Sequence, residues 1–161
     1  MSELRVGLGV DAHAFAAGIP LVLGGFCFED QPRGLAGHSD GDVIAHALTD
    51  ALLGAAGLGD IGTYFPSDDD RWRDADSLQL LRDAYGRVRE AGWELVNADC
   101  VLVGQEPRIA PYRDEMARRL AAALDAPADR VAVRATTTDG LGFTGRSEGL
   151  AAQAVALLTK V

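Results

Sequence analysis

The sequence predicts a single domain of the α/β or α+β class, in which helices pack against a sheet. Its 161 residues match the length of one typical domain, about 100–200 residues. Apolar residues make up 48% of the chain and charged residues 24%, which are ordinary values for a globular protein with a buried core. Strand-like and helix-like segments alternate along the chain, and this alternation is typical of a sheet covered by helices.

The opening strand is predicted by alternation over residues 4–13, where odd and even positions face opposite sides. The even-numbered positions are all apolar, whereas the odd-numbered ones include two glycines, Asp11 and His13. Asp11 and His13 are two residues apart, so both side chains leave the same face of the strand.

Further strands are expected along the chain. Residues 21–23 and 26–28 flank a pair of glycines, and this arrangement predicts a hairpin. Residues 93–103 and 131–138 are β-rich, and we expect a strand in each. Residues 149–161 are ambiguous, because their alanine and leucine content favours a helix while an apolar run also fits a buried strand.

Three helices are expected, over about residues 42–57, 76–91 and 111–124. The second ends before Gly92, and the third begins with Pro111, a residue type suited to a first turn. The first helix has one apolar face. That face is formed by Val43, Ile44, Ala47, Leu48, Ala51 and Leu52.

Charge and hydropathy disfavour two classes of protein. Acidic residues outnumber basic ones by 24 to 15, which gives a formal net charge of −9. A general nucleic-acid binder presents a basic face, so that class is disfavoured. No apolar run approaches the roughly 20 residues that span a bilayer, and residues 1–5 lack the basic head of a secretory signal. We therefore expect a cytoplasmic protein that binds neither nucleic acid nor a membrane.

Asp11, His13 and His46 are candidate ligands of a metal ion. His46 lies in the first turns of the helix over 42–57, opposite the apolar face, so we expect it in polar surroundings. The positive end of the helix dipole disfavours imidazolium there, and neutral imidazole is the form that binds metal. One oxygen and two nitrogens would leave a fourth position open on Zn²⁺, as in catalytic sites. The alternative is ordinary hydrogen bonding, because an Asp and a His two residues apart form a short pattern with many accidental matches.

Two loops near the first helix carry further candidates. Residues 38–42, His-Ser-Asp-Gly-Asp, are either a helix cap or a loop that receives an anion at the helix N-terminus. Residues 59–62, Gly-Asp-Ile-Gly, could admit a small polyol with Asp60 as the acceptor. The alternative for this second loop is a helix-terminating turn with a solvated acidic run over 65–70.

Two more loops follow predicted strands. Residues 104–108 could expose backbone groups to a base edge, or form an ordinary strand-to-helix connection. Residues 136–146 begin with three threonines and a carboxylate and contain three glycines, which suit a phosphate or metal loop. The alternative there is a hydroxyl-rich turn with an Arg146–Glu148 pair. The segment lacks the residue order of a Walker A loop.

Taken in order, these segments resemble the 2-C-methyl-D-erythritol 2,4-cyclodiphosphate synthase family of the non-mevalonate isoprenoid pathway. The resemblance covers essentially the whole chain, 1–161, and its length matches the stand-alone form rather than a fusion with a cytidylyltransferase. The matching stretches are residues 9–13, 38–42, 46–55, 59–62, 65–66 and 135–146.

The resemblance implies an α+β fold with a mixed four-stranded sheet packed on one face by helices, assembled as a homotrimer with active sites between subunits. It also implies that residues 149–161 form a strand. In this family Asp11, His13 and His46 would hold Zn²⁺. A second divalent ion, Mg²⁺ or Mn²⁺, would be held by Asp139, where the family usually has Glu.

The resemblance also implies a substrate, 4-diphosphocytidyl-2-C-methyl-D-erythritol 2-phosphate. His38 and Ser39 would lie near its phosphates, Asp60 and its neighbours would hold the methylerythritol, and the segments 104–108 and 136–137 would line the cytidine pocket. An isoprenoid diphosphate on the threefold axis is also implied, with Arg146 as its anchor and Val10 shaping the cavity. The substrate-binding residues implied are His38, Ser39, Asp60, Ile61, Gly62, Gly104, Gln105, Pro107, Arg108, Thr136, Thr137, Thr138, Phe143 and Arg146.

The implied reaction is an intramolecular phosphoryl transfer, in which the 2-phosphate attacks the β-phosphorus and CMP leaves. Because the nucleophile is already an anion, the main barrier is bringing two anionic phosphates together, which two cations can offset. The alternative is a catalytically impaired trimeric module that keeps its metal and binds isoprenoid diphosphates. Asp139 and Ser67 motivate it, because the family has Glu and Asp at these positions.

Overall fold

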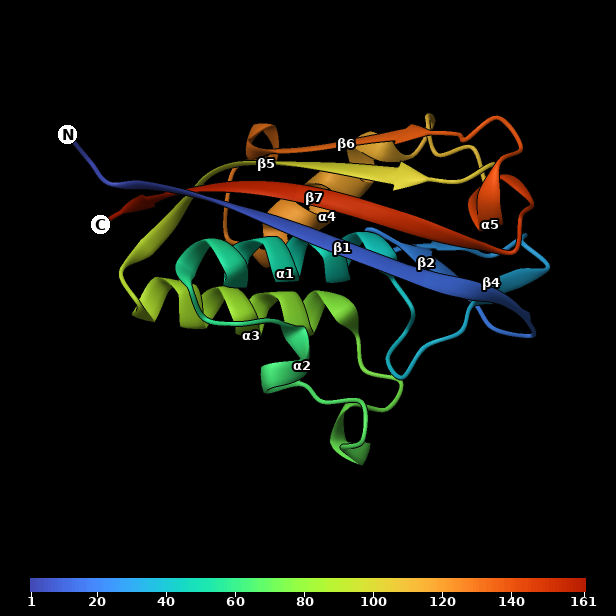
Figure 1. Cartoon of the computed structure of the whole chain (residues 1–161), viewed down its shortest axis with the longest axis horizontal. Helices are drawn as coiled ribbons and strands as arrows, with labels where there is room; N and C mark the ends of the chain where they lie inside the picture. The colour runs from blue at the N-terminus through green and yellow to red at the C-terminus, as the bar shows by residue number, and fades with distance from the viewer.

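A mixed five-stranded sheet is the centre of the computed structural model, which describes residues 1–161 (Figure 1). The strand order is β4-β1-β7-β5-β6, and every neighbouring pair is antiparallel except β5 and β6, which are parallel. The five strands are β1 (Leu4–Ala17), β4 (Arg33–Leu35), β5 (Trp93–Val103), β6 (Val131–Thr136) and β7 (Gly149–Lys160).

The expectation of four strands is wrong by one. β1 continues past His13 as far as Ala17, and its last residues pair with the short strand β4, from Phe15 opposite Leu35 to Ala17 opposite Arg33. Three residues are too few for a period-two pattern to be recognised in a sequence, so this edge strand depends on its tertiary pairing.

The predicted hairpin is confirmed as β2 (Leu21–Leu23) and β3 (Phe26–Phe28), which pair with each other outside the main sheet. Its turn residues Gly24 and Gly25 have φ of 57° and 75°, values that favour glycine. β6 is also confirmed but ends at Thr136, two residues earlier than expected.

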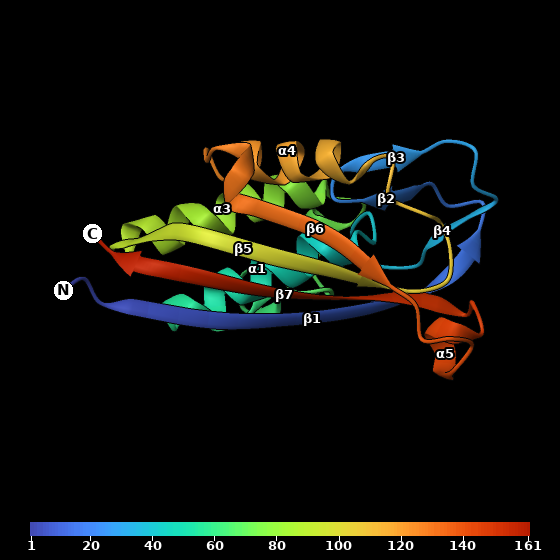
Figure 2. The ribbon, with the colours of Figure 1, turned by 90° about the horizontal axis from the view of Figure 1, so that it is seen from above.

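The three predicted helices are confirmed as α1 (Val43–Ala56), α3 (Ser77–Glu90) and α4 (Arg113–Ala123). Contacts of α1 with β1 and β7, and of α4 with β6, place these helices on one side of the sheet, with α3 against α1 (Figures 1 and 2). α4 begins two residues later than expected, after Pro111. Four short helical turns complete the fold: α2 (Ile61–Tyr64), α5 (Gly142–Gly145) and the 3₁₀ turns Asp70–Trp72 and Ala128–Arg130.

The glycines of β1 allow α1 to lie directly on the sheet. A Cβ atom built on Gly7 would stand 2.0 Å from the carbonyl oxygen of Ala51, and one on Gly9 would stand 1.8 Å from that of Ala47. The alternation predicted for residues 4–13 is therefore present, and the glycine side is the covered one. The apolar side chains Val6 and Leu8 point away from the helices and are 67% and 62% exposed.

The ambiguous C-terminal segment is a strand, as the family resemblance implied. β7 lies between β1 and β5, and its residues Leu150, Ala152, Ala154, Ala156 and Leu158 are buried. A central strand accounts for the nearly continuous apolar run. None of the helices combines the length and the apolar character needed to cross a bilayer.

Candidate metal centre and substrate cleft

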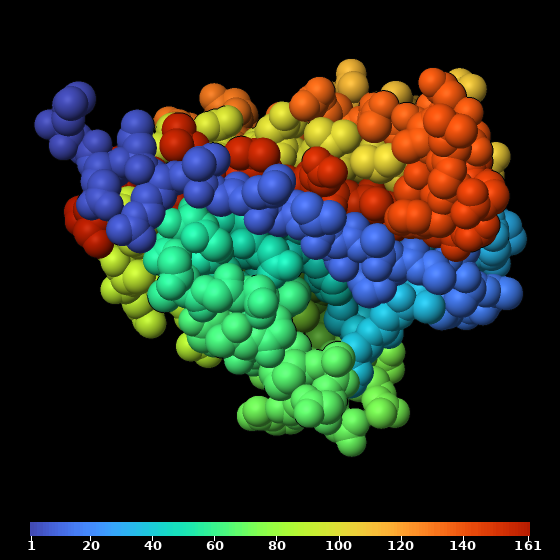
Figure 3. Space-filling model, viewed as in Figure 1, coloured from blue at the N-terminus to red at the C-terminus, as the bar shows by residue number.

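A cavity of about 290 Å³ opens beside β1 and the N-terminal half of α1. The space-filling view shows a hollow below β1, between the green segment around α2 and the cyan segment that precedes α1 (Figure 3). Phe65, Trp72 and Leu80 form its apolar part. Seven of the predicted site residues line it: Asp11, His13, His38, Ser39, His46, Ile61 and Gly62.

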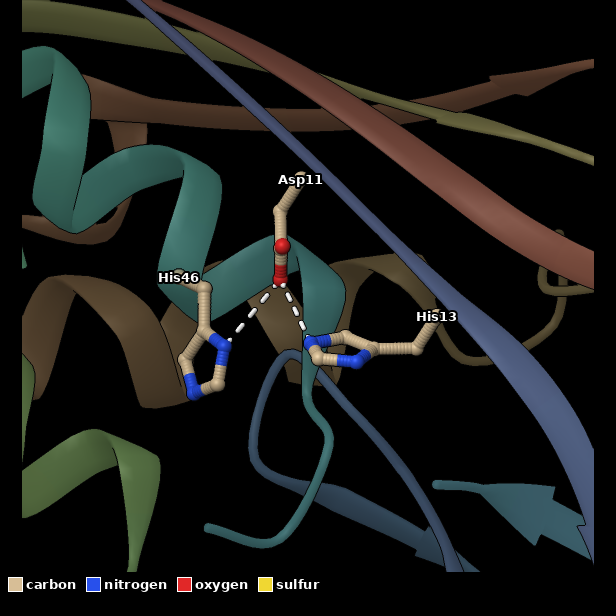
Figure 4. Close-up of side chains that lie close together, drawn as sticks. All are labelled: Asp11, His13 and His46. Atoms are coloured by element: carbon tan, nitrogen blue, oxygen red, sulfur yellow. Dashed lines mark hydrogen bonds and ion pairs between the residues drawn. The ribbon is translucent and has the colours of Figure 1, made fainter. Parts of the chain in front are cut away.

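The three predicted metal ligands meet at this cavity (Figure 4). Asp11 and His13 come from the same face of β1, and His46 comes from the first turn of α1. Asp11 Oδ2 lies 3.0 Å from His13 Nε2 and 3.1 Å from His46 Nδ1. One ligand atom from each of the three residues lies within 4.8 Å of the others. The side-by-side placement of Asp11 and His13 and their meeting with His46 are as predicted.

The donor set fits a tetrahedral metal ion. Zinc–ligand distances of about 2.0–2.1 Å give a tetrahedron with edges of about 3.3 Å, and the two separations from Asp11 Oδ2 are 3.0 and 3.1 Å. His13 Nε2 is buried and has no hydrogen-bond partner, although it lies 3.0 Å from Asp11. A buried nitrogen without a partner is costly, and a cation held by these three side chains would satisfy it.

Electrostatics in the cluster favour an ionised carboxylate. Burial raises the pKa of Asp11, but the close imidazoles of His13 and His46 outweigh burial and lower that pKa to about 2. Burial lowers the pKa of His46, whereas Asp11, together with the charges of Asp42 and Asp40, raises it above the usual value. The predicted effect of the helix dipole, which disfavours imidazolium at His46, is thus opposed by the nearby carboxylates, which raise the pKa of His46.

The second ring nitrogen of His46 faces two hydroxyl groups. His46 Nε2 lies 2.8 Å from Ser39 Oγ and 2.8 Å from Ser77 Oγ. The Ser77 hydroxyl in turn donates to Asp40. The sequence interpretation missed Ser77, which lies 31 residues from His46. It follows the α3 cap Asp76 and carries no local signal of a role at the cavity.

The loop over residues 38–42 was predicted to be either a helix cap or an anion-binding loop, and different residues of the loop fit the two roles. Asp42 is the cap of α1 and accepts a hydrogen bond from Ala45 N at 3.0 Å. His38 and Ser39 instead line the cavity, and His38 Nε2 donates to the carbonyl of Asp69 at 2.9 Å. The cap interpretation is thus confirmed for Asp42.

Asp60 has a structural partner within its own turn. It caps α2 and accepts from the backbone nitrogen of Thr63 at 3.1 Å and from the Thr63 hydroxyl at 3.0 Å, both through Oδ1. Its side chain is not part of the cavity wall, whereas the following residues Ile61 and Gly62 are.

The two segments predicted to face cytidine lie side by side. Gly104 N donates to the Thr136 carbonyl at 3.0 Å, and Thr138 N donates to Gln105 Oε1 at 3.3 Å. This follows from the parallel pairing of β5 and β6, whose carboxyl ends meet at one edge of the sheet. Gln105, Pro107 and Arg108 line a separate cavity of about 510 Å³.

The loop over residues 136–146 does not reach the metal candidates within one chain. Asp139 is exposed, and its side chain accepts only from the Thr137 hydroxyl, at 3.3 Å. Phe143 and Arg146 are also exposed, and Arg146 forms an ion pair with Glu148 at 2.5 Å. None of these residues lines the cavity beside Asp11.

Fold and site together define an α+β protein with a candidate metal centre, in which a carboxylate and two imidazoles converge beside a cleft. The YgbB family model matches residues 4–159, and the chain belongs to the YgbB family.

Several similar proteins share one enzyme name. A relative from Moorella thermoacetica, named 2-C-methyl-D-erythritol 2,4-cyclodiphosphate synthase, is 58% identical over 155 residues, covering 96% of this chain and 94% of the relative. A solved structure of the synthase in a CDP-bound form has a TM-score of 0.86 and 41% identity, covering 96% of this chain and 99% of that one. The structure of the bifunctional IspDF from Campylobacter jejuni has a TM-score of 0.95 and 44% identity. This chain is covered completely and spans 43% of that longer chain.

Proposed function

We propose that this chain is a 2-C-methyl-D-erythritol 2,4-cyclodiphosphate synthase of isoprenoid biosynthesis. It converts 4-diphosphocytidyl-2-C-methyl-D-erythritol 2-phosphate to the cyclic diphosphate and CMP. The observation that carries the proposal is a metal-ligand cluster at a cleft, in a chain that matches a synthase along nearly its whole length. The alternative, a binding module without turnover, finds no support in these relatives, which are named as synthases.

We assign Asp11, His13 and His46 to Zn²⁺ and Asp139 to a second ion, Mg²⁺ or Mn²⁺. When bound, these cations would stabilise the negative charge that the phosphoryl oxygens carry in the transition state. Asp11 supplies an ionised carboxylate, because its pKa is lowered to about 2. The three side chains line the cavity, so an ion that they held would be accessible to a phosphate bound there.

The protein residues around the cavity bind and orient the two phosphates. Ser39 Oγ and the ring of His38 both lie on the cavity wall, and the bond to Asp69 holds the His38 ring in place. The 2-phosphate is itself the nucleophile, so no side chain has to remove a proton. Fixing the nucleophile in line with the β-phosphorus can contribute on the order of 7–11 kcal/mol to the lowering of the barrier.

The cytidine pocket is assigned to residues 104–108 together with 136–138. The adjacency of these two segments supports the assignment, as does the CDP-bound structure of a similar protein. Asp60, Phe143 and the neighbouring residues Ile61 and Gly62 remain assigned to the substrate.

A homotrimer is proposed because the two parts of the site lie apart in one chain. The exposed apolar side chains Leu4, Val6, Leu8 and Val10 along β1 support an interface between subunits. Assembly would bring the 136–146 loop of one subunit to the zinc cavity of another. We also predict that an isoprenoid diphosphate binds on the threefold axis near Val10 and Arg146. The predicted location of the protein is the cytoplasm.

Phosphorus NMR tests the proposed reaction. Purified protein is washed with a chelator, reconstituted with zinc and magnesium, and incubated with the cytidyl substrate. The expected result is a simultaneous appearance of CMP and the cyclic diphosphate. If neither product forms with both metals present, the proposed function is wrong. If only diphosphate binding is observed, the module without turnover is the better interpretation.

A further inference from the structure

The ring of His46 is held between two hydroxyl groups of different character. Ser39 Oγ and Ser77 Oγ both lie 2.8 Å from His46 Nε2. Ser39 belongs to the loop before α1, is only partly buried and lines the cavity. Ser77 is the first residue of α3 and is completely buried. The two serine hydroxyls are therefore equally close to Nε2, but one faces the cavity and the other is buried in the protein.

The hydroxyl proton of Ser77 is already committed to Asp40. The Ser77 hydroxyl donates to Asp40 Oδ1, and the backbone nitrogen of Ser77 donates to Oδ2 at 3.0 Å. Asp40 Oδ1 also accepts from the backbone nitrogen of Asp42 at 3.0 Å. An ionised carboxylate can only accept, and a serine hydroxyl has one proton to donate. Ser77 Oγ can therefore interact with the imidazole only as an acceptor.

When a metal ion takes the place of the proton on Nδ1, the remaining proton of neutral His46 is on Nε2, where Ser77 Oγ accepts it. Nδ1 is the nitrogen that lies 3.1 Å from Asp11 Oδ2 and faces His13 (Figure 4). We infer that Ser77 and Asp40 are positioning residues that hold His46 in the tautomer and orientation needed to bind the metal through Nδ1. Metal-binding histidines commonly donate a hydrogen bond from the N–H of their second ring nitrogen to a carboxylate, a carbonyl or water, and here a serine hydroxyl backed by a carboxylate takes that place. The inference rests on the proposed metal site and adds two residues to it.

The same arrangement separates the roles of the two serines. With the Nε2 proton directed to Ser77, the hydroxyl proton of Ser39 has no acceptor on the imidazole. It is free to be donated into the cavity, where the substrate phosphates are proposed to lie. Ser77 therefore affects metal binding by orienting His46, whereas Ser39 donates a hydrogen bond to the substrate.

A purely structural role for Ser77 makes a different prediction. The Asp40–Ser77 bonds, with the bond from Asp40 N to the Ala75 carbonyl at 3.2 Å, also join the 38–42 loop to the start of α3. If that link were their only role, replacing Ser77 would lower the stability of the metal-free protein and leave the zinc affinity of the folded protein unchanged.

The test compares Ser77→Ala with Ser39→Ala, which removes the other hydroxyl at the same distance from Nε2. Zinc affinity is measured on folded, chelator-washed protein by competition with a chromogenic chelator, and thermal unfolding of the metal-free variants is recorded in parallel. We expect Ser77→Ala to weaken zinc binding by about 10–100-fold and Ser39→Ala to leave it near the wild-type value. Ser77→Thr, which keeps the hydroxyl, should recover most of the affinity.

A second readout is direct. In zinc-loaded protein labelled with ¹⁵N-histidine, NMR should place the His46 proton on Nε2. Wild-type zinc affinity in Ser77→Ala, or a proton on Nδ1, would overturn the inference while the proposed reaction stands. A wild-type protein that binds no zinc would overturn both the inference and the metal assignment. The NMR experiment needs no substitution, so a variant that fails to fold still leaves the inference open to disproof.

Discussion

The zinc candidates and the loop over residues 136–146 differ in how the chain holds them. His46 is buried, and its two ring nitrogens contact residues from β1, α3 and the loop before α1. Asp139, in contrast, is exposed, and its side chain contacts only Thr137 two residues away. The first group is assembled by packing within one chain. The Asp139 side chain has no partner outside its own loop, so its proposed role depends on an ion, a substrate or another subunit.

Removing a ligand from the buried group has the largest expected effect. His46→Ala should abolish zinc binding and lower kcat/KM by about 1,000-fold or more, because a catalytic cation contributes several kcal/mol to transition-state stabilisation. Zinc content is measured by elemental analysis, and turnover is followed by CMP release. Near-normal turnover in zinc-free His46→Ala would contradict the assignment of the triad to catalysis.

Metal binding at the histidine cluster and at Asp139 should differ in its dependence on pH, which is the second-largest expected effect. Zinc competes with protons for its two imidazole ligands, so its affinity should fall on acidification, by up to about 100-fold per pH unit where two protons displace one zinc ion. Although burial lowers the pKa of His46, the nearby Asp11 raises it, so the fall should begin above the ordinary value near 6.5. An ion at Asp139 competes with no imidazole and should stay bound over this range. Competition titrations from pH 8 to pH 5 test both statements, and a flat zinc affinity would exclude two imidazole ligands.

In the metal-free protein, the contribution of His46 to folding stability should have the opposite pH dependence to that of zinc affinity. A raised His46 pKa stabilises the folded state fully below pH 6.5, and this contribution is lost as the pH rises through the raised value. The lowered pKa of Asp11, about 2, stabilises the folded state above pH 3.8 and is lost on acidification toward 2. Urea unfolding with and without the His46→Ala substitution measures the contribution. An equal difference at pH 5.5 and pH 8.5 would refute it.

The exposed loop should respond more weakly to substitution. Asp139→Asn removes one charged contact to the second ion, a loss of about 1.5–3 kcal/mol or roughly 10–100-fold in kcat/KM. Zinc content should be unchanged, and Asp139→Glu should retain most of the activity. Loss of zinc in Asp139→Asn would show that the two regions are not independent.

The packing of α1 against β1, which brings the metal-ligand candidates together, can be tested without substituting any of those candidates. Gly9→Ala places a Cβ 1.8 Å from the carbonyl oxygen of Ala47, and such overpacking should lower the free energy of unfolding by about 1–3 kcal/mol. Gly54→Ala on the open side of α1 meets nothing within 4 Å and should raise stability by about 0.5–1 kcal/mol. Urea unfolding compares the pair. Equal effects would disprove the close approach of α1 to β1.

The sequence was sufficient for features that depend on neighbours along the chain. The helix at α1 was predictable because its cap Asp42, its apolar period and its final Gly57 all lie within one segment. The shared face of Asp11 and His13 followed from strand geometry alone. The order of the motifs also indicated the family before any distance was known.

The tertiary structure decided the features that depend on contacts between distant segments. The covered face of β1 is the glycine face, because only there can the backbone of α1 approach closely. Strand β4 exists because β1 is long enough to pair with it. Ser77 reaches His46 only because α3 packs against α1, and no local pattern marks a contact between residues 31 positions apart. Short-range periodicity can be recognised in the sequence because it depends only on neighbouring residues. The partners of a buried polar group depend instead on which helices and strands pack together.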